Sequence, residues 1–409
     1  MDIRKIQKYA EILIKIGINI QKGQILVIRA PIECAEFTRM AAKYAYEAGA
    51  KEVVIQWGDE LSTKMKYLYA SDEVFDEFPS YLKEFYLSLV RKGAAFLSIS
   101  ASNPELMKDV DPKRLIRQQK VASAEIEEYQ NRLMTNKNAW CIASIPTVAW
   151  AKQVFPKATD EEAVELLWEA ILKTNRIDQK DPVKAWEKHK TNLKKSISFL
   201  NTQNFKLLKF KNKLGTDLEL ELPDNHIWLG GSEFTQDKVE FIANMPTEEV
   251  FTTPKKTGVN GIVYSSKPLN FNGKLIDEFQ LTFKDGRIID CNAKKGLDIL
   301  QELIATDEGS KYLGEVALVP YDSPISQANI LFYNTLYDEN ASCHLAIGRA
   351  YPSCIKNGEN MSDQELVEKG VNFSINHVDF MFGTSDLEIT GITQSGEEVK
   401  VFEKGNFAY

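Results

Sequence analysis

The sequence has few cysteines and few histidines, and it lacks the spacing that would pair the cysteines. Five cysteines are scattered over 409 residues, and no two of them form a C-x-x-C motif. An odd number of scattered thiols argues against a disulfide framework and against a zinc site built from thiolates. The only four histidines are therefore the residues to inspect for metal binding.

Long apolar runs and basic stripes are also missing. No stretch of about 18 uninterrupted apolar residues is present, so no membrane span is expected. Residues 1–8 lack the apolar core and the small-residue cleavage site of a secretory signal. Lysines are interspersed with acidic residues and the formal net charge is −8, which disfavours nucleic-acid binding. We expect a cytoplasmic protein that binds neither membranes nor nucleic acid.

The first half of the chain alternates strand and helix patterns. Amphipathic helices are predicted near residues 2–17 and 32–48. Short apolar runs predict strands at 24–29, 52–57, 94–100 and 140–144. Strands separated by helices predict a parallel sheet covered on both faces. No G-x-G-x-x-G motif or P-loop follows these strands, so a nucleotide site has no support.

The pattern changes near residue 200. Two charged helices are predicted over 159–201, broken around 178–182. Beyond them, short alternating runs and turn signals predict a mainly antiparallel, open barrel-like region with a few helices, including one near 294–306. A chain of this length favours two domains. We expect an N-terminal α/β domain over residues 1–200 and a β-rich domain with the site over 201–409.

A histidine and an aspartate two residues apart form the clearest metal-binding pattern. His377 and Asp379 lie in an apolar, strand-like run, and side chains at i and i+2 of a strand point to the same face. His377 could instead be a core histidine. A carboxylate on the same face argues otherwise, because buried carboxylates are rare without a partner.

Three further residues could complete a site with nitrogen and oxygen ligands for one or two metal ions. His344 follows the segment Asp338-Glu339-Asn340 with its two acidic residues, Glu315 opens an apolar run, and Glu249 follows a predicted strand end. As isolated residues, Glu249 could be surface charge and Glu315 could cap a strand. The other two histidines carry weaker signals. His189 is predicted to be a solvated helix residue, and His226 a turn residue that could line a substrate cleft.

Four strings in this order resemble one family of enzymes. They are Asn244-Met245-Pro246-Thr247-Glu248-Glu249-Val250-Phe251-Thr252-Thr253-Pro254, Gly314-Glu315-Val316-Ala317-Leu318-Val319, Asp338-Glu339-Asn340-Ala341-Ser342-Cys343-His344-Leu345-Ala346-Ile347-Gly348 and Asn376-His377-Val378-Asp379-Phe380-Met381. Together they closely resemble the thermophilic-type dinuclear metallo-aminopeptidases, peptidase family M29. Total length and the change from α/β to β-rich patterns also fit.

The resemblance implies a set of site residues and a homodimer. The implied metal ligands are Glu249, Glu315, His344, His377 and Asp379. Glu248 competes with Glu249 on chemistry alone, but the spacing in the family selects Glu249. An active-site tyrosine of the family matches Tyr351, which could otherwise be ordinary packing. Glu339 resembles an active-site glutamate, either as a proton acceptor or as a residue that orients His344.

Five ligands with three carboxylates suit two divalent cations rather than one open catalytic zinc ion, and Glu315 is our choice for the bridging ligand. Zinc, cobalt, manganese and magnesium all suit such ligands. If residues 341–350 form a helix, His344 and Tyr351 share a face. Pro352 disfavours helical backbone at Tyr351, so we expect this residue at the helix end.

The implied activity is removal of the N-terminal residue from short peptides with a free N-terminus. Glu339 would handle the proton of an attacking water, and Tyr351 would donate a hydrogen bond to the developing oxyanion. Two alternatives remain open from the residues themselves. One is a metal-dependent amidase or esterase acting on small molecules, and the other is a non-catalytic protein that binds metal or peptide.

Overall fold

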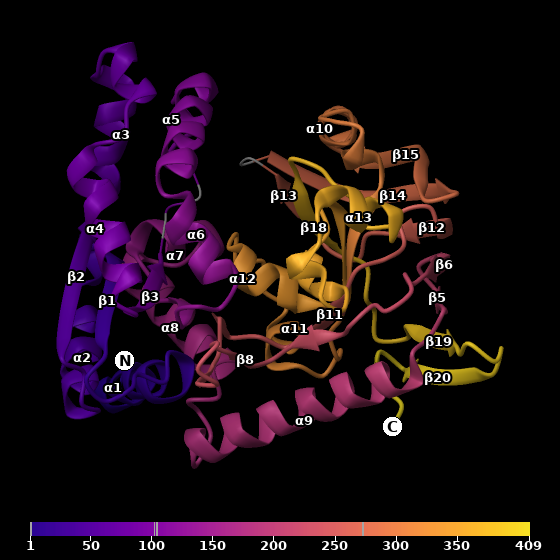
Figure 1. Ribbon diagram of the computed structural model, residues 1–409, viewed down its shortest axis with the longest axis horizontal. Coiled ribbons are helices and arrows are strands. Elements are labelled where there is room, and N and C mark those ends of the chain that lie inside the picture. Colours follow the sequence, from indigo (N-terminus) through magenta and orange to yellow (C-terminus); the bar gives the residue numbers. More distant parts are fainter. Residues whose placement is uncertain (1, 102, 104, 272–273) are drawn as a thin grey trace. The chain divides into compact units, whose positions relative to one another are not determined.

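The computed structural model describes residues 2–101, 103, 105–271 and 274–409 (Figure 1). The chain divides into two compact units. The first consists of Met1–Lys188 and Ser232–Pro246, and the second of His189–Gly231 and Thr247–Tyr409. The sequence predicted one boundary near residue 200. The compact units differ from that division because the segment Ser232–Pro246 packs with the first unit.

The first unit is built on a parallel sheet with the strand order β10-β4-β3-β1-β2. Its strands are β1 (Ile25–Pro31), β2 (Glu52–Gly58), β3 (Ala95–Ser100), β4 (Trp140–Ser144) and β10 (Asn244–Met245). The chain steps outward from β1 to β2 and then returns past β1 to β3. Right-handed crossovers in opposite directions place the intervening helices on opposite faces of the sheet. The predicted parallel α/β architecture is confirmed.

Helices of the first unit pack through apolar and aromatic side chains. Tyr9, Phe37 and Trp168 form one aromatic group that joins three helices. Another cluster joins β1 and β3 to two further helices through Tyr86 and Tyr129. The helices are α1 (Ile3–Ile12), α2 (Ala35–Glu47), α3 (Glu60–Tyr69), α4 (Ser80–Arg91), α5 (Pro112–Glu125), α6 (Glu127–Met134), α7 (Val148–Val154) and α8 (Asp160–Thr174). Helix α9 (Pro182–Gln203) begins in this unit and ends in the second.

The second unit contains two antiparallel sheets. The smaller has the order β18-β17-β16-β11-β7, with β7 (Leu229–Gly230), β11 (Val250–Thr252), β16 (Leu313–Leu318), β17 (His344–Gly348) and β18 (His377–Met381). The larger has the order β13-β14-β12-β6-β5-β19-β20-β21, with β15 beside β14. Its strands are β5 (Leu207–Lys211), β6 (Asp217–Glu221), β12 (Val259–Tyr264), β13 (Leu269–Phe271), β14 (Lys274–Lys284), β15 (Arg287–Lys295), β19 (Glu388–Ile392), β20 (Glu398–Glu403) and β21 (Asn406–Phe407).

Shorter elements complete the chain. A further strand pair, β8 (Glu233–Phe234) with β9 (Glu240–Phe241), belongs to the first unit. The remaining helices of the second unit are α10 (Leu297–Ile304), α11 (Pro324–Ala328), α12 (Thr335–Asp338) and α13 (Asp363–Glu368). The turn between β14 and β15 has Asp285 and Gly286 both at positive φ, the backbone that an Asp-Gly hairpin favours. Within the described part of the chain, no helix is both long and apolar enough to cross a bilayer.

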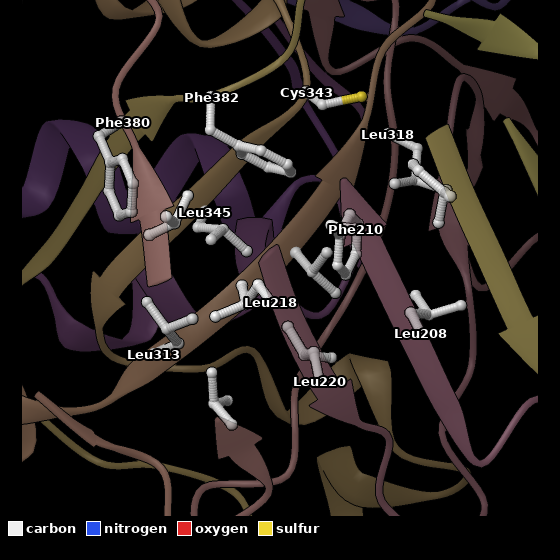
Figure 2. Packing of buried hydrophobic residues seen from close by; sticks show 14 of the residues in the cluster. Leu208, Phe210, Leu218, Leu220, Leu313, Leu318, Cys343, Leu345, Phe380 and Phe382 are labelled. Atoms are coloured by element: carbon white, nitrogen blue, oxygen red, sulfur yellow. The ribbon is translucent and has the colours of Figure 1, made fainter. Parts of the chain in front are cut away.

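The core of the second unit lies between its two sheets. Side chains from β5 and β6, such as Phe210 and Leu218, belong to the same buried cluster as Leu345 of β17 and Phe380 of β18. Figure 2 shows these side chains gathered between the strands. Because side chains alternate along a strand, every inward residue of β17 and β18 has outward neighbours on the other face. That outer face carries the candidate site.

Candidate metal centre

Successive side chains of strand β17 point alternately into the core and to the opposite face of the sheet. Leu345 and Ile347 belong to the buried cluster, so His344, Ala346 and Gly348 point to the opposite face of the sheet. The small residues at the second and third of these positions leave room above the strand. The side chain of His344, at one end of β17, can therefore reach residues of the neighbouring strands.

Register brings the other predicted ligands to the same face. Across the ladder from β17, His377 pairs with Gly348 and Asp379 pairs with Ala346. On the other side of β17, Glu315 of β16 also pairs with Ala346. The predicted shared face of His377 and Asp379 is therefore confirmed, and Glu315 joins it.

Two overlapping groups of ligand atoms result. One contains Glu249, Glu315 and His344, the other contains Glu315, His377 and Asp379, and the atoms of each group lie within 4.8 Å of one another. His344 Nε2 lies 3.2 Å from Glu249 Oε2 and 3.6 Å from Glu315 Oε1. His377 Nε2 lies 3.5 Å from Glu315 Oε2 and 3.4 Å from Asp379 Oδ1. Glu315 thus presents a different carboxylate oxygen to each histidine.

Backbone carbonyls orient both imidazole rings. Nδ1 of His344 lies 3.1 Å from the carbonyl oxygen of Ser342, and Nδ1 of His377 lies 2.7 Å from that of Arg349. A carbonyl can only accept, so each Nδ1 donates its proton. The neutral tautomer then has its lone pair on Nε2, which faces the carboxylates in both cases. Metal-binding histidines commonly have this arrangement.

The prediction of a helix over residues 341–350 is wrong, because His344–Gly348 forms strand β17. Its alternating small and large residues fit a strand between two neighbours better than a helix, and tertiary pairing decides the outcome. The prediction for Tyr351 holds in part. Its backbone is extended, as Pro352 required, but it follows a strand rather than a helix. Its ring lies 4.8 Å from that of His377 and 6.0 Å from that of Phe251.

Burial and neighbouring charges raise the pKa values of Glu339, Glu315 and His377. Burial, followed by repulsion from Glu249 and Asp379, raises the pKa of Glu339 well above its usual range. Burial also raises the pKa of Glu315. Burial by itself lowers the pKa of His377, but Asp379 and Glu315 more than reverse this and raise it to about 9. These shifts share one cause, which is the concentration of carboxylates in a buried site.

The residues present fit bound divalent cations. Buried oxygens Oε2 of Glu249 and Oδ1 of Asp379 have no hydrogen-bond partner within the described ranges. An uncompensated buried carboxylate is costly, and a coordinated cation removes that cost. Carboxylate oxygens together with imidazole nitrogens suit zinc, cobalt, manganese or magnesium better than soft ions.

Two supporting contacts carried no signal in the sequence. The carboxylate of Asp307 accepts hydrogen bonds from Ser310, from the hydroxyl of Ser374 and from the backbone N–H of Ile375. This network fixes the segment that leads into His377. In addition, the side chain of Asn340 accepts a hydrogen bond from the backbone N–H of Glu248, immediately before Glu249. Asp307 and Ile375 are 68 residues apart in the sequence, and Asn340 and Glu248 are 92 residues apart. The local sequence around Asp307 or Asn340 therefore does not indicate either contact.

The two weaker histidine predictions have different outcomes. The prediction that His189 is solvated is wrong, because its side chain is 11% exposed and its Nε2 lies 2.8 Å from the carbonyl oxygen of Thr247. Glu248, the competitor of Glu249, lies beside this imidazole rather than in either ligand group. His226 lies in a turn as predicted, where Nδ1 donates to Pro223, but it is buried.

Comparison with known proteins identifies the family of this chain. The family model described as thermophilic metalloprotease (M29) matches residues 3–407. Aminopeptidase 2 of Geobacillus stearothermophilus is 48% identical over 406 residues, covering 99% of this chain and 98% of the relative. Aminopeptidase AmpS of Bacillus subtilis (strain 168) is also 48% identical over 406 residues, covering 99% of each.

A solved structure gives the same result for the fold. The structure of wild-type AmpT from Thermus thermophilus superposes with a TM-score of 0.92 at 35% identity and covers 99% of each chain. The predicted fold class and family resemblance are thereby confirmed. This chain belongs to the M29 family of thermophilic metalloproteases and is a metal-dependent aminopeptidase.

Proposed function

We propose that this enzyme removes the N-terminal residue from short unblocked peptides, using two divalent cations held on one face of the smaller sheet in its second unit. The proposed ligands are Glu249, Glu315, His344, His377 and Asp379. One observation carries the proposal: Glu315 points one carboxylate oxygen at each of the two histidines. A shared carboxylate between two ligand groups is the arrangement expected for a bridged pair of ions.

Bound divalent cations would supply Lewis acidity, polarising a carbonyl and lowering the pKa of water toward neutrality. The side chains around them have separate tasks. Glu339 lines the same cavity as His377 and Asp379, and this position supports a role as the group that takes a proton from water and passes it to the leaving amine. The alternative role for Glu339 is to orient the metal ligand His344.

Tyr351 is the proposed hydrogen-bond donor to the oxyanion. Burial, followed by the negative charges of Glu315 and Asp379, raises the pKa of its phenol. The hydroxyl therefore keeps its proton at neutral pH and can donate to an oxygen that becomes negative. The ring contact with His377 supports its placement beside the ligands.

Peptide cleavage with and without a blocked N-terminus tests this function. Purified enzyme supplied with zinc, cobalt, manganese or magnesium should release the first amino acid from Leu-Gly-Gly and should leave N-acetyl-Leu-Gly-Gly intact. Chelation should abolish release, and added metal should restore it. Equal cleavage of the acetylated peptide, or full activity after chelation, would contradict the proposal and favour an amidase that needs no free amine.

We also propose a cytoplasmic homodimer. All five cysteines are unpaired, which supports a reducing compartment. Helix α3 exposes Leu61, Met65 and Tyr69, which recur every four residues and so share one side of the helix. This apolar stripe supports an interface with a second copy. Light scattering of the purified protein should give twice the chain mass of 46.4 kDa, and a mass of one chain would contradict the dimer.

A further inference from the structure

A cavity of about 330 Å³ lies beside the proposed metal centre, within the second unit. His377, Asp379 and Glu339 form part of its lining, whereas Glu249 and His344 do not. The cavity therefore adjoins one end of the centre, on the side of the second ligand group. The proposed chemistry gives no role to the remainder of this space.

Apolar and polar residues share the wall of this cavity. Met381 projects from the same face of β18 as His377 and Asp379, since it is two residues further along the strand. The apolar lining residues are Pro268, Leu269, Phe271, Leu331, Val378 and Met381. An apolar cavity of about 150 Å³ is enough to bind benzene. A space twice as large can accept a leucine, methionine or phenylalanine side chain.

Residues 333–335 form another part of the wall, in a loop that is hydrogen-bonded to Asp338. The carboxylate of Asp338 accepts hydrogen bonds from the backbone N–H groups of Phe332, at 2.8 Å, and Asn334, at 2.9 Å. Tyr333 between them has φ of +54°, a conformation that tyrosine rarely adopts. Strained backbone of this kind persists only where its surroundings impose it, and it is common at ligand sites. Tyr333, Asn334 and Thr335 all line the cavity.

We propose that this cavity receives the side chain of the substrate's first residue and selects large apolar side chains over small or acidic ones. The inference rests on the proposed function, because an aminopeptidase must hold the first residue next to the ligands that act on its amine and carbonyl. Each methylene group that the substrate side chain buries against the apolar lining residues makes binding more favourable. No lysine or arginine is present among the described lining residues to pair with an acidic side chain, so burying that charge would be costly.

Narrowing the cavity tests its role. Thr335 lines the cavity but is exposed, so Thr335→Phe adds bulk there without disturbing the core. Thr202→Phe on α9 is the matched control, because Thr202 is also exposed and lies outside the cavity lining. The measured quantity is kcat/KM for tripeptides X-Gly-Gly in which X is glycine, alanine, leucine, phenylalanine or glutamate.

We expect the natural enzyme to prefer leucine over alanine by roughly 10–200-fold, and to process glutamate most slowly. Thr335→Phe should lower the leucine-to-glycine ratio at least about tenfold, and Thr202→Phe should leave it unchanged. If peptides are cleaved but Thr335→Phe alters no ratio, the cavity does not hold the first side chain. If no peptide is cleaved with any metal, the proposed function fails as well.

Binding of the free product gives a readout that is independent of turnover. Calorimetry with L-leucine and with glycine should show tighter binding of leucine to the natural protein. Leu331→Ala shortens an apolar wall residue and should weaken leucine binding by about tenfold while changing glycine binding little. Equal affinities for the two amino acids, or a loss of both in the variant, would overturn the inference.

Discussion

Ala346 of β17 lies directly opposite Asp379 of β18 in their antiparallel ladder. Directly opposed residues have their Cβ atoms about 4.5–5.5 Å apart, so a larger side chain at residue 346 would occupy the space beside the Asp379 carboxylate. Glu315 lies opposite Ala346 on the other side. The small Ala346 side chain therefore leaves space for the carboxylates of Glu315 and Asp379 to lie beside the two histidines.

Replacement of Ala346 by leucine should displace metal. We expect Ala346→Leu to fold, at a cost of about 1–3 kcal/mol, and to bind metal at least about tenfold more weakly. Metal titration by calorimetry measures the affinity, and thermal unfolding measures the stability. Ile347→Leu on the core face of the same strand is the control and should retain metal. Unchanged metal affinity in Ala346→Leu would show that this space is not the site.

Removal of the Tyr351 hydroxyl should slow peptide cleavage without affecting metal binding. Tyr351→Phe keeps the ring against His377 and loses the proposed oxyanion donor, so kcat should fall by about 10²–10³. Metal content should stay as in the natural protein. Tyr312→Phe, which alters a phenol paired with Arg287 outside the site, should leave kcat unchanged. A Tyr351→Phe enzyme with normal kcat would assign this residue to packing alone.

Two glutamate-to-glutamine variants separate a proton carrier from a ligand. Glu339→Gln should reduce kcat by about 10²–10⁴, change its dependence on pH and retain bound metal. Glu315→Gln should lose metal from both ligand groups, because each group includes this carboxylate. If Glu339→Gln instead weakens metal binding by about 10–100-fold, the residue orients His344 rather than carrying protons. Elemental analysis and pH–rate profiles of the two variants give the answer.

The Asp307 network should make stability depend on pH in the acid range. Burial raises the pKa of Asp307, but hydrogen bonds from Ile375, Ser310 and Ser374 outweigh it and leave the pKa below the ordinary 3.8. The folded state therefore binds this proton less readily than the unfolded state. The resulting stabilisation is present above pH 4 and is lost as pH falls through the lowered pKa.

Urea unfolding of Asp307→Asn measures this contribution. At pH 7 the variant should be less stable by about 1–3 kcal/mol, and the difference should shrink as pH falls below about 4. Asp298→Asn on α10 is the control, because Asp298 is an exposed carboxylate in the same unit. A constant difference across the whole pH range would show that the charge of Asp307 is not responsible.

Local patterns in the sequence predict much of this structure. The strands of the parallel sheet are short apolar runs between helices, and their positions are confirmed to within one or two residues. The pairing of His377 with Asp379 on one face follows from alternation alone. The four strings, taken in their order along the chain, then select Glu249, Glu315 and His344 through family resemblance.

Long-range pairing accounts for the predictions that failed. His344–Gly348 contains small residues compatible with a helix, and it is a strand because β16 and β18 flank it on both sides. His189 has charged neighbours and is nevertheless nearly buried, because it packs against Thr247, 58 residues away. The packing of Ser232–Pro246 with the first unit depends on the parallel pairing of β10 with β4. None of these contacts can be read from a local window.

Anomalous diffraction from crystals of the purified protein, recorded at the absorption edge of the bound metal, would locate the ions of the proposed dinuclear centre. We expect two ions for each chain. One should lie within coordination distance of Glu249, Glu315 and His344, and the other of Glu315, His377 and Asp379. A single ion, or ions held by other residues, would contradict this expectation.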